Sequence, residues 1–200
     1  MALIYEPRWK SYVAATTEPV FTPQQCDDVI RIGQKQKIEK AGIGPGFLEN
    51  KNKNKSSVDK KIRVTKIGWI PFSAARPMYI AIERWMLNTN ANHFGFEGMQ
   101  ITEAAQYTEY SKGCFYDWHQ DSSENMANMP PVRKISMTLL LNDPKEFKGG
   151  ELELTKEGKS FNLKRGYAIF FASFLRHRIK RVTKGNRKSL VMWFGGPPLK

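Results

Sequence analysis

Four residues in the second half of the chain could together bind a metal ion and a dicarboxylate. His119 and Asp121 are two positions apart, His177 follows 56 residues after Asp121, and Arg187 follows ten residues after His177. Two histidines and one carboxylate can occupy one face of an octahedral ion and leave three positions open for other ligands. The guanidinium of Arg187 could hold a carboxylate through two parallel hydrogen bonds. The pattern therefore indicates a non-haem Fe(II) enzyme with a dicarboxylate co-substrate.

The metal interpretation depends on how the chain presents His119 and Asp121. Residues two apart on a strand point to the same side, so both can face inward if this segment is extended. The remaining ligand must come from elsewhere, and the chain has only three histidines, which are His93, His119 and His177. His93 lies at an expected helix end, where a capping or surface role is favoured. Taken alone, the H-x-D pair is also explained by two polar residues on a strand edge.

Short β-type segments, separated by Gly, Pro, Asn and Asp turns, would position these residues. Regular short strands predict a sandwich or barrel, here with helices packed outside one sheet. Residues 183–186 are typical of a hairpin connection, so His177 and Arg187 would lie on the two arms of one hairpin. The expected strands are residues 101–110, 114–119, 134–141, 152–155, 167–171, 177–182 and 188–194.

Two helices are expected before these strands. Thr22 is a candidate N-cap, with Pro23 at the first helical position and Gln25 placed to complete a capping box. This helix is predicted to run to about residue 37. A second helix is predicted over residues 77–90, where apolar residues recur at the spacing of one helix face.

A polar stretch rich in Lys and Asn, residues 49–61, lies between the two helices. It has almost no apolar side chains to bury, so we expect a loop. The composition allows either an inert insertion or a lid over the site.

The size and composition are those of one globular domain. The chain has 200 residues, 40% of them apolar, and no apolar run approaches the length of a membrane span. The first seven residues lack the apolar core of a signal peptide, and Cys26 and Cys114 are too few for a disulfide framework, so a cytoplasmic enzyme with reduced thiols is expected. The formal charge of +13 favours acidic partners, among them nucleic acid, an acidic protein or a small dianion.

The residues around the candidate ligands carry a more specific pattern. Tyr110, Gly113 and Tyr116 precede His119 and Asp121 with the spacing Y-x-x-G-x-x-Y-x-x-H-x-D. This set resembles the prolyl 4-hydroxylase-like branch of the Fe(II)/2-oxoglutarate-dependent dioxygenases, over about residues 100–197. Matching positions continue downstream at Leu139–Asn142, Gly149–Leu152, Gly166–Ala168, Phe170, Ser173, His177, Val182, Gly185–Arg187 and Trp193.

The resemblance implies a fold and a set of ligands. The fold would be α+β and mainly β, a double-stranded β-helix (a cupin-like jelly roll) with the N-terminal helices packed on one sheet. One domain would span residues 1–200, with helical support over about 1–95 and the catalytic β-helix over about 96–200. Iron would be held by His119, Asp121 and His177.

The resemblance also implies that Arg187 binds the distal carboxylate of 2-oxoglutarate and that Tyr110 lines the co-substrate pocket. Some family members place a tyrosine that touches 2-oxoglutarate at the start of the segment 139–142, where this chain has leucine. The supporting hydrogen bond to Arg187 could then come from Tyr110, Thr138 or Ser189.

The reaction implied is hydroxylation of a C–H bond with Fe(II), 2-oxoglutarate and O2, which releases succinate and CO2 and uses ascorbate as a possible reductant. Peptidyl proline, giving 4-hydroxyproline, is the favoured substrate. Tyr116, Arg176 and Trp193 are candidates for the substrate rim, although Tyr116 and Trp193 could equally be barrel packing. The alternatives are an oxygenase acting on nucleic acid or another protein side chain, and a basic binding module without turnover.

Overall fold

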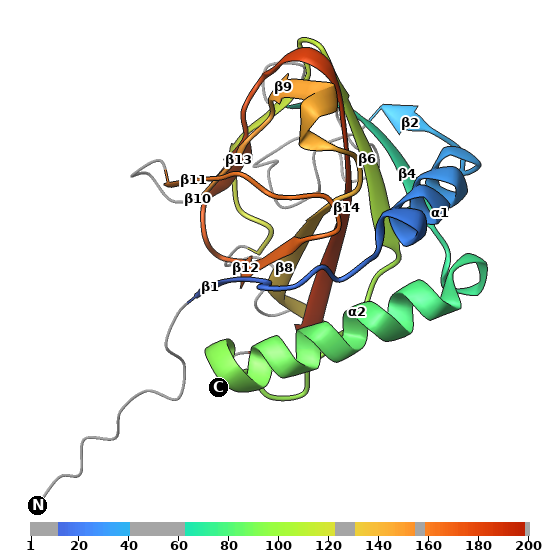
Figure 1. Ribbon diagram of the computed structural model, residues 1–200. Coiled ribbons are helices and arrows are strands. Elements are labelled where there is room, and N and C mark those ends of the chain that lie inside the picture. Colours follow the sequence, from blue (N-terminus) through green and yellow to red (C-terminus); the bar gives the residue numbers. More distant parts are fainter. Residues whose placement is uncertain (1–11, 41–62, 123–130, 155–158, 199–200) are drawn as a thin grey trace, which may run out of the picture.

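The protein folds into two antiparallel β-sheets, with two α-helices on the outer side of one of them (Figure 1). The computed structural model describes residues 12–40, 63–122, 131–154 and 159–198. The Lys/Asn stretch 49–61 lies outside these residues. Within the described ranges, no helix is long and apolar enough to cross a membrane. The mainly β architecture with N-terminal helices agrees with the sequence prediction.

The larger sheet has nine strands in the described part of the chain, in the order β1-β12-β8-β14-β6-β4-β2, with β5 and β9 paired to β14 beside this path. Strand β14 is the longest, and it pairs with both β8 and β6. The strands are β1 (Val13–Ala15), β2 (Glu39–Lys40), β4 (Lys66–Ile70), β5 (Gln100–Ile101), β6 (Ala105–Ser111), β8 (Val132–Leu140), β9 (Phe147–Gly149), β12 (Ala168–Ala172) and β14 (Val182–Gly196).

The smaller sheet has five strands in the same described ranges, in the order β11-β10-β13-β7-β3. Both sheets therefore combine strands that lie far apart in the sequence. Strand β3, which precedes α2, pairs with β7 at the edge of the smaller sheet. Its strands are β3 (Arg63–Val64), β7 (Phe115–His119), β10 (Leu152–Leu154), β11 (Lys159–Phe161) and β13 (His177–Ile179).

Helix α1 (Pro23–Gln34) starts where the sequence predicts. The Thr22 hydroxyl accepts the Gln25 N–H and the Gln25 side chain accepts the Thr22 N–H, which confirms the capping box. The helix ends three residues before the predicted residue 37. Helix α2 (Arg76–Thr89) matches the second prediction within one residue at each end, and a π-helical turn (Asn90–Phe94), which contains His93, continues it.

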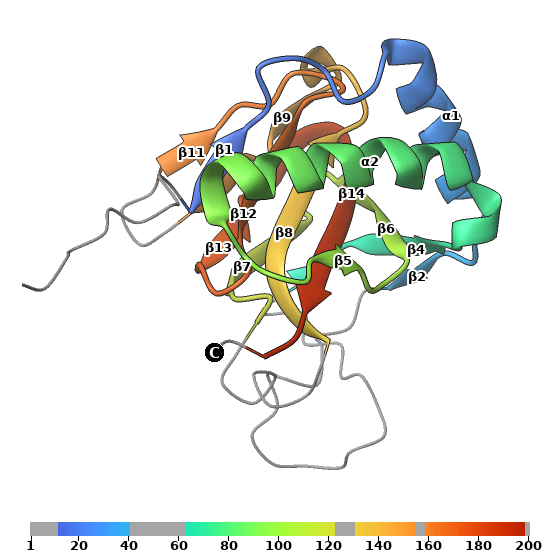
Figure 2. The same cartoon turned by 90° about the horizontal axis from the view of Figure 1, so that it is seen from below.

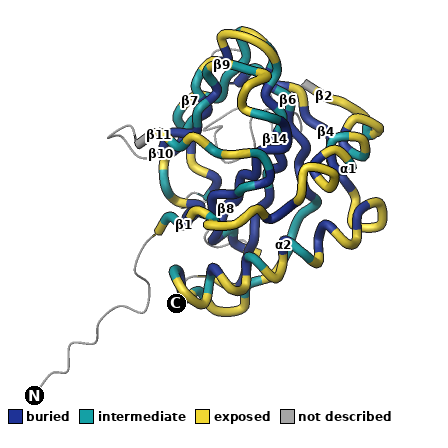
Figure 3. The backbone as a smooth tube through the Cα atoms, viewed as in Figure 1, coloured by how far each residue is buried: buried dark blue, intermediate teal, exposed yellow. Residues whose placement is uncertain are grey.

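Alternation along the strands gives the larger sheet two different faces. On β8, Ile135, Met137 and Leu139 are fully buried and belong to the cluster that packs against α1 and α2. This core lies along the middle of the molecule (Figure 3). The opposite face of β8 carries Ser136 and Thr138, which are buried toward the smaller sheet. A polar row inside the fold is costly without hydrogen-bond partners, so this face is where a site is expected.

The second core lies between the two sheets. Ile169 and Phe171 of β12 pack with Leu152 and Leu154 of β10 and with Ile179 of β13. Ile169 pairs with Thr138, and Phe171 pairs with Ser136, so these apolar residues lie on the polar face of the larger sheet. These apolar contacts join the smaller sheet to β12 of the larger sheet. The polar side chains of Ser136 and Thr138 lie next to these contacts, on the neighbouring strand β8. Figure 2 shows β8 and β14 from below, with α2 crossing them.

The predicted hairpin connection at residues 183–186 is wrong. These residues belong to β14 and pair with β9, with Gly185 opposite Phe147. Gly185 has φ +72°, and a Cβ there would lie 2.0 Å from the carbonyl oxygen of Glu146, so this glycine serves a close approach rather than a chain reversal. His177 and Arg187 consequently lie in different sheets, with the two-residue link 180–181 between their strands.

Candidate metal centre and co-substrate site

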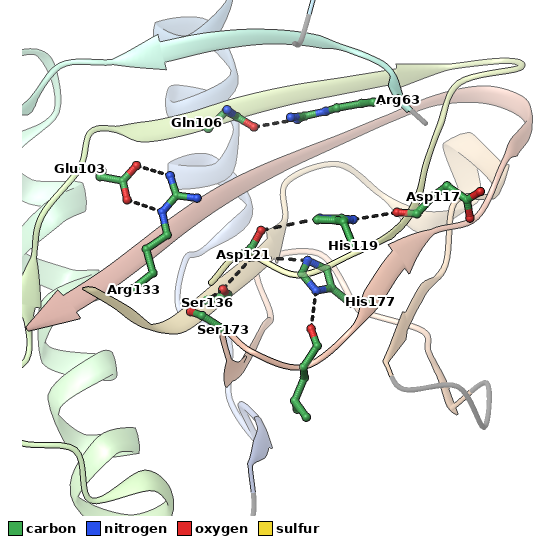
Figure 4. Close-up of polar contacts among 11 residues, drawn as sticks. Arg63, Glu103, Gln106, Asp117, His119, Asp121, Arg133, Ser136, Ser173 and His177 are labelled. Atoms are coloured by element: carbon green, nitrogen blue, oxygen red, sulfur yellow. Dashed lines mark hydrogen bonds and ion pairs between the residues drawn. The ribbon is translucent and has the colours of Figure 1, made fainter. Parts of the chain in front are cut away.

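Strand pairing brings the three candidate ligands together. His119 ends β7 and His177 begins β13, and these two residues are register partners. Asp121 lies two residues after the end of β7, at a bend. Its Oδ1 lies 3.7 Å from His119 Nε2 and its Oδ2 lies 3.4 Å from His177 Nε2. One ligand atom from each residue lies within 4.8 Å of the others, and the three side chains converge in Figure 4.

Each ligand is held by a neighbour that fixes its orientation. The Nδ1 atoms of His119 and His177 lie 2.8 Å and 3.0 Å from the carbonyl oxygens of Asp117 and Leu175, which leaves each Nε2 directed into the cluster. The Ser136 hydroxyl donates to Asp121 Oδ2 at 2.7 Å. Such partners fix the tautomer of a metal-binding histidine, so this arrangement is preorganised.

The environment favours the protonation states that a metal needs. His119, Asp121 and His177 are 3%, 8% and 5% exposed. Burial, with His177 close by, lowers the pKa of His119 well below its usual value, which favours the neutral imidazole. Burial alone would raise the pKa of Asp121, but the nearby histidines hold the pKa of that carboxyl well below its usual range. Two neutral nitrogens and one carboxylate oxygen fit Fe(II).

A β-bulge brings Tyr116 beside the cluster. Between the pairs His177–His119 and Ile179–Tyr116, β7 has one residue more than β13. The extra residue places Tyr116 and His119, three positions apart, on the same face. Their rings stack with centroids 3.4 Å apart and an interplanar angle of 12°. Burial raises the pKa of Tyr116 to about 12, so the phenol stays neutral.

Arg187 is buried on the polar face of the larger sheet. Its Nη1 donates to the Ser189 hydroxyl at 2.8 Å, and its guanidinium carbon lies 5.9 Å from the Tyr110 ring centroid. The Ser189 and Thr108 hydroxyls are 2.6 Å apart. The sequence left three candidates for the hydrogen bond to Arg187. Ser189 makes this bond, and Tyr110 lies near the guanidinium. No hydrogen bond joins Thr138 to Arg187.

The Arg187 guanidinium has no carboxylate partner among the ion pairs of the described residues. Burial lowers the pKa of Arg187, but a guanidinium keeps its charge at neutral pH. A cavity of about 320 Å³ reaches Arg187, and Leu140, Leu152 and Phe161 contribute apolar walls to it. A buried, unpaired cation beside a cavity of this size suits a small dicarboxylate.

The predicted rim residues have different surroundings. Trp193 is 6% exposed, its ring lies 6.1 Å from that of Trp69, and the Arg133 guanidinium lies 4.1 Å from its centroid. Its indole Nε1 has no hydrogen-bond partner in the described part of the chain. Arg133 also pairs with Glu103, as Figure 4 shows. Arg176 is exposed next to His177, and the structure brings it into no contact with the cluster.

Several contacts near the cluster were not predicted from the sequence, although Ser173 was named there as a motif position. Ser136 and Ser173 bind each other at 2.9 Å, and the Ser173 carbonyl accepts the Asp121 N–H. Arg63 donates to Gln106 at 2.9 Å and lies over the Tyr116 ring. A period-two reading of 132–140 could have placed Ser136 on the polar face, whereas Arg63 depends on the distant pairing of β3 with β7.

Comparison with known proteins identifies this region. Residues 105–195 match the 2OG-Fe(II) oxygenase superfamily. A PKHD-type hydroxylase of Picosynechococcus sp. is 38% identical over 90 residues, which are 44% of this chain and 39% of the relative. A PKHD-type hydroxylase of Colwellia psychrerythraea is 37% identical over 129 residues, 55% of this chain and 57% of the relative. The matches thus span about half of such relatives or less.

Solved structures show the same fold over nearly the whole chain. A Pseudomonas putida prolyl-4-hydroxylase aligns with TM-score 0.69 and 18% identity, and the match covers 94% of each chain. The viral collagen prolyl hydroxylase of Paramecium bursaria Chlorella virus-1 aligns with TM-score 0.70 and 18% identity, covering 94% of this chain and 97% of the viral one.

Residues 105–195 therefore match the 2OG-Fe(II) oxygenase superfamily, whose members use Fe(II), 2-oxoglutarate and O2, and the cluster of His119, Asp121 and His177 fits iron binding. Together with the PKHD-type relatives and the shared fold of the prolyl hydroxylase structures, this match confirms the resemblance to prolyl 4-hydroxylase-like 2OG-Fe(II) oxygenases seen in the motifs.

Proposed function

We propose that this chain is a 2-oxoglutarate-dependent dioxygenase that hydroxylates peptidyl proline to 4-hydroxyproline. The observation that carries the proposal is the convergence of the three ligands. His119, Asp121 and His177 present two nitrogens and a carboxylate to one point. Asp121 is bonded to Ser136 on the polar face of the larger sheet, and Arg187 lies on that face with no carboxylate partner among the described ion pairs.

In this proposal His119, Asp121 and His177 hold Fe(II), and Arg187 holds the distal carboxylate of 2-oxoglutarate. Bound together, the metal and co-substrate supply the oxidising chemistry that converts a C–H bond into an alcohol, with release of succinate and CO2. The chain orients the groups around them. Ser136 fixes the second oxygen of Asp121 by its hydrogen bond, and Ser189 fixes the Arg187 guanidinium. The apolar walls at Leu140 and Leu152 exclude water from the co-substrate.

The substrate assignment draws on the surroundings of the metal cluster. Aromatic side chains lie around it: Tyr116 stacks on His119, and Trp193 is the register partner of Ser136, which binds Asp121. The likeness to prolyl hydroxylases, one of which is described in complex with a hypoxia inducible factor peptide fragment, supports a peptide substrate. The excess of basic residues suits an acidic protein or peptide as well as nucleic acid.

We propose further that the two sheets form a double-stranded β-helix and that residues 1–200 make one oxygenase domain. The antiparallel pairing in both sheets and the alignment with prolyl hydroxylase structures support this arrangement. The N-terminal part contributes to both sheets through β1, β2, β3 and β4, so it would be part of the catalytic fold as well as its helical support.

The test is a turnover assay with Fe(II), 2-oxoglutarate and ascorbate, in which succinate is measured with a panel of proline-rich peptides and with oligonucleotides. Stimulation by peptides, with a mass increase of one oxygen on proline, is the expected result. Stimulation by oligonucleotides alone would assign the enzyme to nucleic acid. Binding of either panel without any 2-oxoglutarate turnover would support the alternative of a binding module.

A further inference from the structure

Arg63 is a buried cation beside the metal cluster, and its guanidinium has no carboxylate partner among the described residues. It is 8% exposed, and it lies on β3 opposite Tyr116 of β7. Its Nη2 donates to the side-chain oxygen of Gln106 at 2.9 Å, and its guanidinium lies 4.4 Å from the Tyr116 ring centroid. Its Nε has no hydrogen-bond partner among the described residues.

Three other arginines in the described ranges each have the carboxylate partner that Arg63 lacks there. Arg133 pairs with Glu103, Arg165 with Asp27, and Arg178 with Glu153. Arg63 is more buried than these three arginines, yet it has only a neutral amide and an aromatic face. A buried guanidinium with an unused N–H is unfavourable unless a ligand completes its bonding.

The position of Arg63 points to the substrate rather than to 2-oxoglutarate. Its contact with the cluster passes through Tyr116, whose ring stacks on His119. Gln106, its hydrogen-bond partner, is paired across the sheet with Trp69, whose ring contacts Trp193. Figure 4 shows Arg63 and Gln106 on strands beside the three metal-site residues.

A second unused donor lies in the same neighbourhood. The Trp193 Nε1 is buried and has no partner among the described residues. It comes from β14, two residues beyond the partner of Gln106. Arg63 reaches Gln106, and Trp69, which is paired with Gln106, has its ring beside that of Trp193. Two buried N–H groups without acceptors, linked in this way, call for a ligand that supplies acceptor oxygens.

We propose that Arg63 is a specificity-determining residue that binds a carboxylate of the peptide substrate, so that the enzyme prefers a proline flanked by Asp or Glu. This inference rests on the proposed function. A carboxylate matches a guanidinium in charge and geometry, and it would satisfy the free Nε. The chain's net charge of +13 favours the approach of acidic peptides.

The experiment compares matched peptides with Arg63→Gln, Arg63→Lys and the control Arg31→Gln. The peptides carry proline beside Asp or beside Asn and are capped at both ends, and one Asn peptide keeps a free C-terminal carboxylate. Arg31 is an exposed arginine on α1, so its substitution makes the same charge change away from the site. The measurements are calorimetric peptide binding without oxygen, hydroxylation by mass spectrometry, and 2-oxoglutarate turnover without peptide.

Wild type and Arg31→Gln should prefer the Asp peptide over its Asn match by about 10- to 100-fold, the range for a hydrogen bond to a charged group. Arg63→Gln should lose that preference, whereas Arg31→Gln should keep both the preference and the 2-oxoglutarate turnover without peptide. Arg63→Lys should keep part of the preference, which also tests the proposal if Arg63→Gln does not fold. Preference for the free C-terminus alone would overturn the flanking side chain as the source of the carboxylate.

Other outcomes would overturn the role of Arg63. One is equal binding of Asp and Asn peptides by wild type, or the absence of any peptide binding. Another is loss of turnover and of metal affinity in Arg63→Gln with the peptide preference retained, which would make Arg63 a support for Tyr116 and His119. If Asp peptides bind through Arg63 while no proline is hydroxylated, the recognition stands and the proposed reaction fails.

Discussion

The Ser189→Ala substitution tests how the chain prepares Arg187 for 2-oxoglutarate. Ser189 is fully buried and Arg187 is 3% exposed, so no solvent can replace the 2.8 Å hydrogen bond between them. Without it one guanidinium N–H is left unsatisfied, and unfolding stability should fall by about 1–3 kcal/mol. The Arg187 side chain also gains rotamer freedom, and binding of 2-oxoglutarate must then restrict it again.

The expected effect on binding follows from that freedom. An arginine side chain carries about 2 kcal/mol of rotamer entropy, of which the Ser189 contact restricts a part. A loss of about 1–2 kcal/mol, or about 5- to 30-fold in 2-oxoglutarate affinity, is therefore expected. Titration calorimetry on the Fe(II)-loaded protein without oxygen measures it directly. Iron affinity should not change, because Ser189 contacts none of the three ligands.

Thr138→Val is the matched control. Thr138 lies on the same face, on the neighbouring strand β8, and is similarly buried, but its hydroxyl makes no hydrogen bond to Arg187. Its substitution should leave 2-oxoglutarate affinity within about twofold, the range of a change away from the contact. The reasoning is refuted if Ser189→Ala binds 2-oxoglutarate as wild type does, or if Thr138→Val weakens binding as strongly.

Further substitutions probe the rest of the site. His119→Ala, Asp121→Ala and His177→Ala should each abolish turnover and weaken iron binding while circular dichroism stays native, and near wild-type turnover at limiting iron would exclude that residue as a ligand. Arg187→Lys should raise the 2-oxoglutarate KM less than Arg187→Ala does, because lysine keeps the charge and loses the planar fork; equal KM values would refute the bidentate contact. Gly150→Ala should destabilise the fold by about 1–3 kcal/mol in thermal unfolding and raise the 2-oxoglutarate KM, because φ is +73° and the added Cβ would lie 2.9 Å from Arg187 Cδ. A Gly150→Ala protein with wild-type stability and KM would show that this approach is unimportant.

Features set by local sequence could be predicted well. The capping box at Thr22 and Gln25 depends on residues three apart, and it occurs as expected. Four of the seven strands predicted in the second half agree within two residues at both ends. The predicted strands 101–110, 177–182 and 188–194 are wrong by three to six residues at one end, because pairing with distant strands sets those ends. The metal ligands His119, Asp121 and His177 could be predicted because their spacing matches the motif of the resembled family.

Features set by distant pairing could not be predicted. The sequence around Gly185 is typical of a turn, but Gly185 lies inside a 15-residue strand. Its positive φ allows the backbone to pack directly against the carbonyl oxygen of Glu146. The β-bulge that stacks Tyr116 on His119 depends on the register of β7 against β13. Edge strands of two or three residues, such as β3, are too short to show a period. Arg63 could therefore not be placed near the metal cluster from the sequence.

The polar face of the larger sheet explains where ligands are expected to bind. Most polar groups on it are satisfied by a neighbour within the fold, as the hydroxyls of Thr108 and Ser189 show. Arg187 and Trp193 on this face, and Arg63, which reaches Gln106 on this face from β3, carry our proposals. Arg63 Nε and Trp193 Nε1 have no acceptor among the described residues, and Arg187 has no carboxylate partner among the described ion pairs. A buried donor without an acceptor is unfavourable, so a fold that retains it gains stability when a ligand binds. On this reasoning Arg187 marks the co-substrate, and Arg63 with Trp193 marks the peptide.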